Sequence, residues 1–202
     1  MQADWVFVGL GNPGPQYAMT RHNIGFLVIQ AMAEALGWQM KYESRFSAET
    51  AKGKVGQVTV HLLMPLTYMN ESGLAVRRYL DYYKLAPGTV LVVADDVAIP
   101  FGERRVKPQG GAGGHNGLKS VEQALGTQYY RRFRMGIGGK PTAEHVLDRF
   151  TPDEIERLAP WIARTVEVMK QLTKEEFSEV MKQENSKKSI QNNQALKEGQ
   201  ES

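Results

Sequence analysis

The spacing of apolar residues changes along the chain between strand-like and helix-like patterns, which predicts strands alternating with helices. Strands are expected at residues 5–10, 46–52, 55–64, 90–94, 104–107 and 131–137. The runs at 5–10 and 90–94 are apolar throughout, as in a strand buried on both faces. The second and third strands are expected to form a hairpin that turns at Gly53 and Lys54.

Capping residues predict where the helices begin and end. Helices are expected at residues 23–37, 72–84, 116–125 and from 151 onward, with a short last helix that Thr173 introduces. Asn23 is expected to cap the first helix, and Gly126 to close the third. Thr151 and Glu154 have the spacing of a capping box around Pro152. The apolar residues expected on the inner face of the helix from 151 are Ile155, Leu158, Ile162, Val166 and Met169.

This alternation over 202 residues predicts one α/β domain, since no repeat or linker divides it. We expect the domain to span residues 1–184. From about Asn185 the composition becomes polar and rich in Gln, Asn and Lys, so residues 185–202 are expected to be a disordered tail.

The composition excludes several classes of protein. The 42% of hydrophobic residues suits a packed core, yet no run approaches the roughly 18–20 apolar residues of a membrane span. The chain has no cysteine, which excludes disulfides, thiolate metal sites and a cysteine nucleophile. The lack of cysteine and of a secretory signal at the N-terminus predicts a cytoplasmic protein.

Residues 9–14 have the GxGxxG spacing of a dinucleotide-binding loop, but their context argues against such a site. Pro13 and Pro15 lie where a Rossmann loop would already be entering a helix. The nearest acid at the required distance, Glu34, lies in a helical pattern instead of at a strand end. Nucleotide binding at this stretch is therefore disfavoured.

A second glycine-rich stretch, GGAGGHNG at residues 110–117, does not have P-loop spacing, because Leu118 stands where a P-loop has lysine. The stretch is still a flexible backbone that runs into a helix N-terminus. Such an end favours anionic or electron-rich groups.

Polar side chains collect just beyond three of the predicted strands. Asn12 follows the first strand, Asn70 follows the strand that ends near residue 64, and Asp95 follows the run at 90–94. Ligands of open α/β sheets bind beyond the carboxyl ends of the strands, so we expect these side chains to meet. His22 lies on the loop after the first strand, and His115 lies with Asn116 at the glycine-rich helix entry.

These residue types indicate hydrolysis of an ester or amide without a covalent intermediate. A histidine held by an aspartate can take a proton from water, and asparagine amides can hold a carbonyl or an oxyanion. Structural alternatives stay open, because His22 could cap the following helix and Asp95 and the asparagines could be turn residues. His61 lies in an apolar strand and is expected to be structural, and no pattern supports a role for His145.

The net charge of +3 is mild, so the positions of the basic residues matter more than their number. Those near the second glycine-rich stretch are Arg104, Arg105, Lys107, Lys119, Arg131, Arg132 and Arg134. If the two strands that carry most of them are adjacent, they form a positive rim suited to phosphate. An ordinary solvated face is the alternative.

Four blocks of the sequence together resemble the signature motifs of bacterial peptidyl-tRNA hydrolases. They are GLGNPGPQYAMTRHNIGF, MPLTYMNESG, GGAGGHNGLKS and FRMGIG, and the resemblance covers nearly all of residues 5–180 in order. It implies a single α/β domain with a mixed, twisted sheet surrounded by helices. It also implies hydrolysis of the ester between a peptide and the 3′ ribose of tRNA by a monomer that needs no metal or other cofactor.

The resemblance implies a role for each matching position. His22 corresponds to the catalytic base that activates water, and Asp95 to the acid that orients it. The positions that correspond to substrate-binding residues are Asn12, Tyr17, Met69, Asn70 and Asn116. Lys107 and Arg134 correspond to the residues that contact tRNA phosphate.

One segment departs from the family pattern. Where the family often has His-Asp-Glu-Leu-Asp-Leu-Pro, this chain has Ala-Asp-Asp-Val-Ala-Ile-Pro at residues 94–100, so Ala98 replaces the later acid while Asp95 is retained. Two rival classes are a non-catalytic RNA-binding splicing cofactor of the same fold and a nucleotide-dependent oxidoreductase. The retained histidine, aspartate and asparagines favour the hydrolase.

Overall fold

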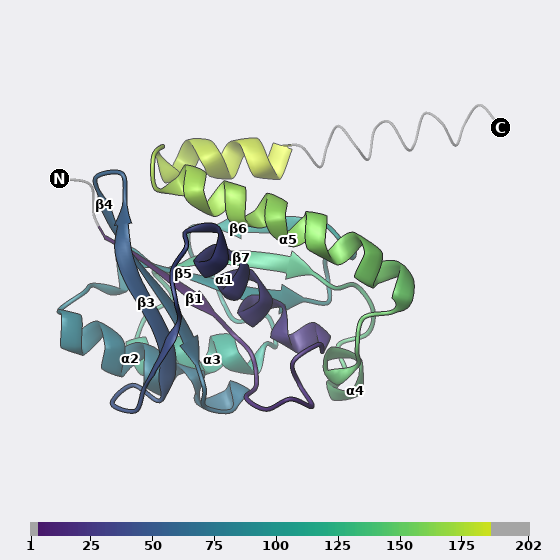
Figure 1. Ribbon diagram of the computed structural model, residues 1–202. Coiled ribbons are helices and arrows are strands. Elements are labelled where there is room, and N and C mark those ends of the chain that lie inside the picture. The colour runs from purple at the N-terminus through teal and green to yellow at the C-terminus, as the bar shows by residue number, and fades with distance from the viewer. Residues whose placement is uncertain (1–3, 187–202) are drawn as a thin grey trace.

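The computed structural model describes residues 4–186, in which seven strands form one sheet with helices on both faces (Figure 1). The strands are β1 (Trp5–Gly9), β2 (Lys41–Glu43), β3 (Ala48–Val55), β4 (Val58–Pro65), β5 (Val90–Asp96), β6 (Arg104–Lys107) and β7 (Arg131–Gly136). Their order across the sheet is β2-β3-β4-β1-β5-β7-β6. The neighbours among β4, β1, β5 and β7 are parallel, whereas β2–β3, β3–β4 and β6–β7 pair antiparallel. The mixed sheet implied by the family resemblance is confirmed.

The helices alternate with the strands as the sequence predicts. They are α1 (Ile24–Ala35), α2 (Ser72–Tyr83), α3 (Asn116–Leu125), α4 (Ala143–Leu147) and α5 (Pro152–Leu172), with short 3-10 turns η1 (Arg21–Asn23), η2 (Met69–Glu71) and η3 (Pro87–Thr89). Residues 177–186 are also helical. Strand β2 and helix α4 are not predicted from the sequence, because neither is long enough to show a periodicity.

Two hydrophobic cores lie on opposite faces of the sheet, because successive side chains of a strand point to opposite sides. Phe7 packs on the face covered by α1 and α5, whereas Val6 and Val8 pack on the face covered by α2 and α3 (Figure 1). In β7 the same alternation places Phe133 and Met135 in the first core.

The hairpin of β3 and β4 turns later than predicted. Gly53 pairs with Val60 inside the ladder, and the turn is at Gly56, which has a φ of 61°. A Cβ at Gly53 would collide with the Trp38 ring, so this glycine serves close packing and not the turn.

Two details of the last helices also differ from prediction. The Thr151 capping box is present, but Ile155 is half exposed instead of buried. Thr173 ends α5, where its hydroxyl donates to the Lys170 carbonyl, so it does not introduce the next helix. A threonine hydroxyl can serve either terminus, and the sequence alone did not distinguish them.

Most of the predicted tail, residues 187–202, lies outside the described residues. The first residue assigned to it, Asn185, is held against the edge strand β6. Its side-chain Oδ1 accepts from the Val106 N–H at 3.1 Å, and its Nδ2 donates to the Val106 carbonyl at 2.9 Å. These bonds pair the open edge of β6 much as another strand would.

His61 is a buried structural histidine, as predicted. It is 1% exposed, and its Nδ1 lies 2.9 Å from the Tyr79 hydroxyl. Burial, followed by the charge of Lys52, lowers the pKa of His61 from 6.5 to about 4.

We expect His61 to make the fold acid-sensitive. Between pH 6.5 and 4 the unfolded chain binds a proton that the folded chain excludes, so the free energy of unfolding should fall by roughly 2–3 kcal/mol as pH decreases through this range. The measurement is urea denaturation at several pH values for the wild type and His61→Gln, which should show a flatter dependence. Asn70→Ala, an exposed position with no titratable group, is the control and should keep the wild-type slope. An equal slope in wild type and His61→Gln would contradict the assignment.

Candidate active site

A cleft with a volume of about 540 Å³ opens beyond the carboxyl ends of β4, β1 and β5. Because these strands are parallel neighbours, the segments that follow them meet at one edge of the sheet. The predicted site residues that line the cleft are Asn12, His22, Met69, Asn70, Asp95, Asn116 and Arg134.

Asn12 is held in the cleft wall by a chain of buried hydrogen bonds. Asn23 accepts from the Asn12 N–H at 2.8 Å and donates to the Asn12 carbonyl at 2.9 Å. The Asn12 Oδ1 in turn accepts from the Met69 N–H at 2.8 Å, which leaves the side-chain NH₂ of Asn12 to donate to a bound group. Asn23 was predicted to cap α1, and it stands at that position, but its side chain makes no capping bond.

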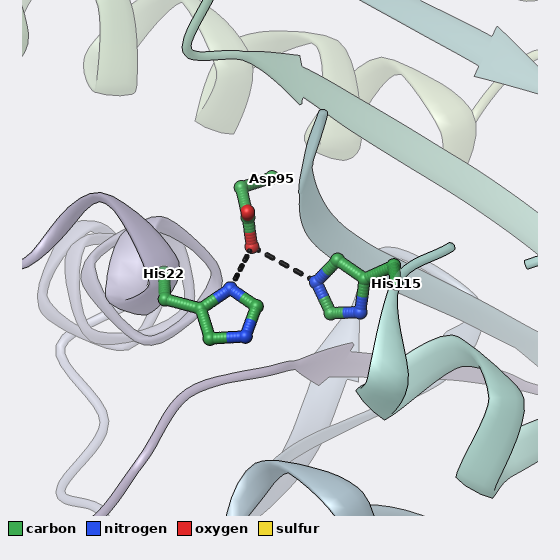
Figure 2. Close-up of side chains that lie close together, drawn as sticks. All are labelled: His22, Asp95 and His115. Atoms are coloured by element: carbon green, nitrogen blue, oxygen red, sulfur yellow. Dashed lines mark hydrogen bonds and ion pairs between the residues drawn. The ribbon is translucent and has the colours of Figure 1, made fainter. Parts of the chain in front are cut away.

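His22 and Asp95 form a buried pair. The Nδ1 of His22 lies 2.7 Å from Oδ1 of Asp95, and the two side chains come from η1 and the end of β5 (Figure 2). Because a carboxylate only accepts, Nδ1 carries the proton. The other nitrogen, Nε2, is then left with a lone pair, which is the form that a general base requires.

His115 completes this cluster, although the sequence analysis gave it no role. Its Nε2 lies 2.9 Å from the same Oδ1 of Asp95 (Figure 2). Its Nδ1 accepts from the N–H groups of Gly117 and Leu118, at 3.1 and 3.2 Å, and so caps α3. The signal available in the sequence was its position one residue before the helix that Asn116 begins, but histidine is not among the usual capping residues.

The two imidazoles determine the charge state of Asp95. Burial alone would raise the pKa of this carboxyl, which is 3% exposed. Interactions with His115, followed by those with His22, instead hold the pKa well below its usual range. Asp95 is therefore an acceptor for both rings at neutral pH.

Among the described residues, His22, Asp95 and His115 are grouped closely enough to be considered as metal ligands, with ligand atoms within 4.8 Å of one another. Two imidazoles and a carboxylate are a known set for transition metals. To bind a metal through Nε2, however, a neutral His115 would have to move its proton to Nδ1, where two backbone N–H groups already donate. The donor set fits shared protons better than a resident metal.

Asp96 is a second residue of the cleft to which the sequence analysis assigned no role. Its Oδ2 lies 2.9 Å from Nε of Arg134, and Arg134 also donates to the Ala112 carbonyl at 3.2 Å. Arg134 thus ties the end of β5 to the glycine-rich loop.

The remaining candidates lie around the cleft. Tyr17 is not one of its lining residues and sits in the preceding turn, where its N–H donates to the Gly14 carbonyl. Lys107 is half-buried at the end of β6, outside the cleft. Strands β6 and β7 are adjacent, as the predicted basic rim requires, but Arg132 is 1% exposed and belongs to the interior.

Helix α4 contributes Ala143, Val146 and Leu147 to the wall of the cleft. The loop that carries His22 is anchored next to this helix. The Arg21 N–H donates to the Asp148 carbonyl at 3.0 Å, and its guanidinium forms a 2.6 Å ion pair with Glu154. The residue before His22 is thereby fixed to the start of α5. Asn70 and Asn116 are exposed at the mouth of the cleft.

None of the helices within residues 4–186 is both long and apolar enough to cross a membrane. The fold and the cleft define an α/β protein with a buried histidine–aspartate pair in a cleft at the carboxyl ends of parallel strands.

Comparison with known proteins identifies the family. The family model for peptidyl-tRNA hydrolase matches residues 6–193. The chain is 45% identical over 170 residues to a peptidyl-tRNA hydrolase of Gloeobacter violaceus (81% of this chain, 85% of that one) and 41% identical over 180 residues to one of Geobacillus kaustophilus (87% and 96%). The crystal structure of peptidyl-tRNA hydrolase from Acinetobacter baumannii has a TM-score of 0.85 at 34% identity and covers 92% of this chain and 96% of that one. The chain belongs to the peptidyl-tRNA hydrolase family and is an enzyme of that family.

We expect Asn23→Ala to destabilise the protein by about 2–4 kcal/mol, because it leaves the buried N–H and carbonyl of Asn12 unpaired. The measurement is the free energy of unfolding by urea denaturation. Asn70→Ala is the matched control and should change stability by less than about 0.5 kcal/mol, since this asparagine is exposed. Equal stability of the two variants would contradict a clamping role for Asn23.

Proposed function

We propose that this enzyme cleaves the ester between the peptide and the 3′ ribose of tRNA by direct attack of a water molecule that His22 activates. The observation that carries the proposal is the 2.7 Å contact between His22 Nδ1 and Asp95, which leaves Nε2 as a base in the wall of the cleft. No covalent intermediate is needed, because an ester is readily attacked by an activated water.

In the first step, Nε2 of His22 takes a proton as the water oxygen bonds to the ester carbonyl carbon. The charged imidazole is stabilised by the ionised Asp95. When the tetrahedral intermediate collapses, the bond to the ribose 3′ oxygen breaks and that oxygen receives the proton from His22. The products are a peptide carboxylic acid, which releases its proton to solvent and becomes a carboxylate, and tRNA with a free 3′ hydroxyl.

The asparagines are assigned to substrate positioning. The NH₂ of Asn12 can donate to the carbonyl oxygen as it becomes negative, since its Oδ1 is committed to Met69. Asn70 and Asn116 at the cleft mouth can bind the peptide backbone. Met69 supplies apolar contact in the wall, and Tyr17 remains a candidate for contact only with parts of the substrate outside the cleft.

Lys107 and Arg134 are assigned to the phosphates of tRNA, but the two side chains differ in accessibility. Arg134 is engaged by Asp96 and is 8% exposed, so only its remaining N–H groups are available. Lys107 is more accessible, and the exposed Arg105 lies on the same side of β6 two residues away. We also propose that the enzyme acts in the cytoplasm as a monomer.

A splicing cofactor of the same fold would bind RNA without hydrolysis. Incubation with N-acetyl-aminoacyl-tRNA and, separately, with free aminoacyl-tRNA distinguishes the two functions. The proposed enzyme should release only the blocked amino acid, and binding without release would favour the cofactor.

We expect His22→Ala to reduce kcat by about 10²–10⁴-fold, because the general base is lost. Affinity for deacylated tRNA should stay close to that of the wild type, since the basic residues are intact. The measurements are release of N-acetyl-amino acid and a tRNA-binding titration. Turnover retained in this variant would remove His22 from the mechanism.

We expect Lys107→Met to weaken tRNA binding and to reduce the slope of log K against log salt by about one phosphate contact. Lys54→Met is the control, because this exposed lysine lies on β3, near the edge of the sheet opposite β6. A titration of tRNA at several salt concentrations gives both slopes. An unchanged slope for Lys107→Met would argue against its contact with phosphate.

A further inference from the structure

His115 uses its two ring nitrogens for two different contacts. Nε2 meets the Asp95 carboxylate at 2.9 Å, and Nδ1 meets the first backbone N–H groups of α3. The ring is 9% exposed, and its centroid lies 4.8 Å from that of His22. Both imidazoles therefore converge on one oxygen of Asp95 (Figure 2).

The backbone contacts determine where the proton of His115 lies. A nitrogen that accepts from the N–H groups of Gly117 and Leu118 carries no proton. The proton is then on Nε2, which donates to Asp95. The start of α3 thus selects the tautomer that the site uses, and a proton on Nδ1 would face two other donors and remove the cap.

We propose that His115 is a positioning residue, which joins the start of α3 to the carboxylate that orients His22. With two donors from different elements on one oxygen, Asp95 cannot rotate without losing one of them. The proposal rests on the proposed function, in which the orientation of His22 limits the rate.

The glycine-rich loop connects His115 to the mouth of the cleft, where the substrate is proposed to bind. Gly113 and Gly114 have φ values of 61° and 86°, which let the chain reverse just before His115. Asn116, the next residue, lies at the cleft mouth. A substrate contact at Asn116 therefore acts on the same short segment that holds Asp95.

Two substitutions separate the two contacts. His115→Asn keeps an acceptor near the position of Nδ1 and a residue favoured at helix N-caps, but it is too short to reach Asp95. His115→Gln places an amide near the position of Nε2, where it can donate to Asp95, but it is a poor cap. Each variant is thus the control for the other.

We expect His115→Asn to keep the thermal midpoint of the wild type and to lose about tenfold or more in kcat, with KM nearly unchanged. His115→Gln should lower the midpoint by about 2–4 °C while keeping kcat within about threefold of the wild type. The readouts are turnover of N-acetyl-aminoacyl-tRNA and thermal unfolding. Wild-type kcat in His115→Asn, or equal loss in both variants, would overturn the proposal.

A second measurement is independent of turnover. Long-range ¹H–¹⁵N spectra of the wild-type histidine rings should show His115 protonated on Nε2 and His22 protonated on Nδ1. A proton on Nδ1 of His115 would overturn the proposal even in an active enzyme. If the wild type fails to hydrolyse the ester while the tautomers are as stated, the proposed function fails and the tautomer assignment for His115 stands.

Discussion

The shared oxygen of Asp95 is the contact on which the site depends. It lies at the end of a central strand, 2.7 Å from one imidazole and 2.9 Å from another, and it is almost fully buried. A buried carboxylate is costly unless it is paired, and here the pairing also orients the two rings. The same interaction therefore keeps the acid charged and leaves Nε2 of His22 without a proton.

Around this oxygen, the residues of the site are joined more by hydrogen bonds between a side chain and the backbone than by bonds between two side chains. Asn23 holds the backbone of Asn12, Asn12 holds the backbone of Met69, and the start of α3 holds His115. Contacts to backbone transmit the rigidity of the strands and helices to the site. This arrangement gives the side chains of the cleft defined positions.

The basic residues near the glycine-rich loop differ in exposure, which their number alone does not show. Arg132 and Arg134 were grouped with Lys107 as a positive rim, but the first is interior and the second is tied to Asp96. Arg105, Lys107 and Lys119 keep the accessibility that phosphate binding requires. Burial, which depends on what packs over β7, determines which of the arginine side chains are accessible.

The sequence by itself determined the order of strands and helices, most of their bounds, the capping box at Thr151 and the set His22, Asp95, Asn12, Asn70 and Asn116. Those features follow from local periodicity, capping and polar residues at strand ends. Tertiary structure alone decided that Asn23 clamps Asn12, that Gly53 packs against Trp38 and that His115 shares Asp95 with His22. Each of these depends on a contact between segments far apart in the chain. A local pattern does not distinguish a cap, a turn residue and a contact within the site, because it does not specify the distant partner.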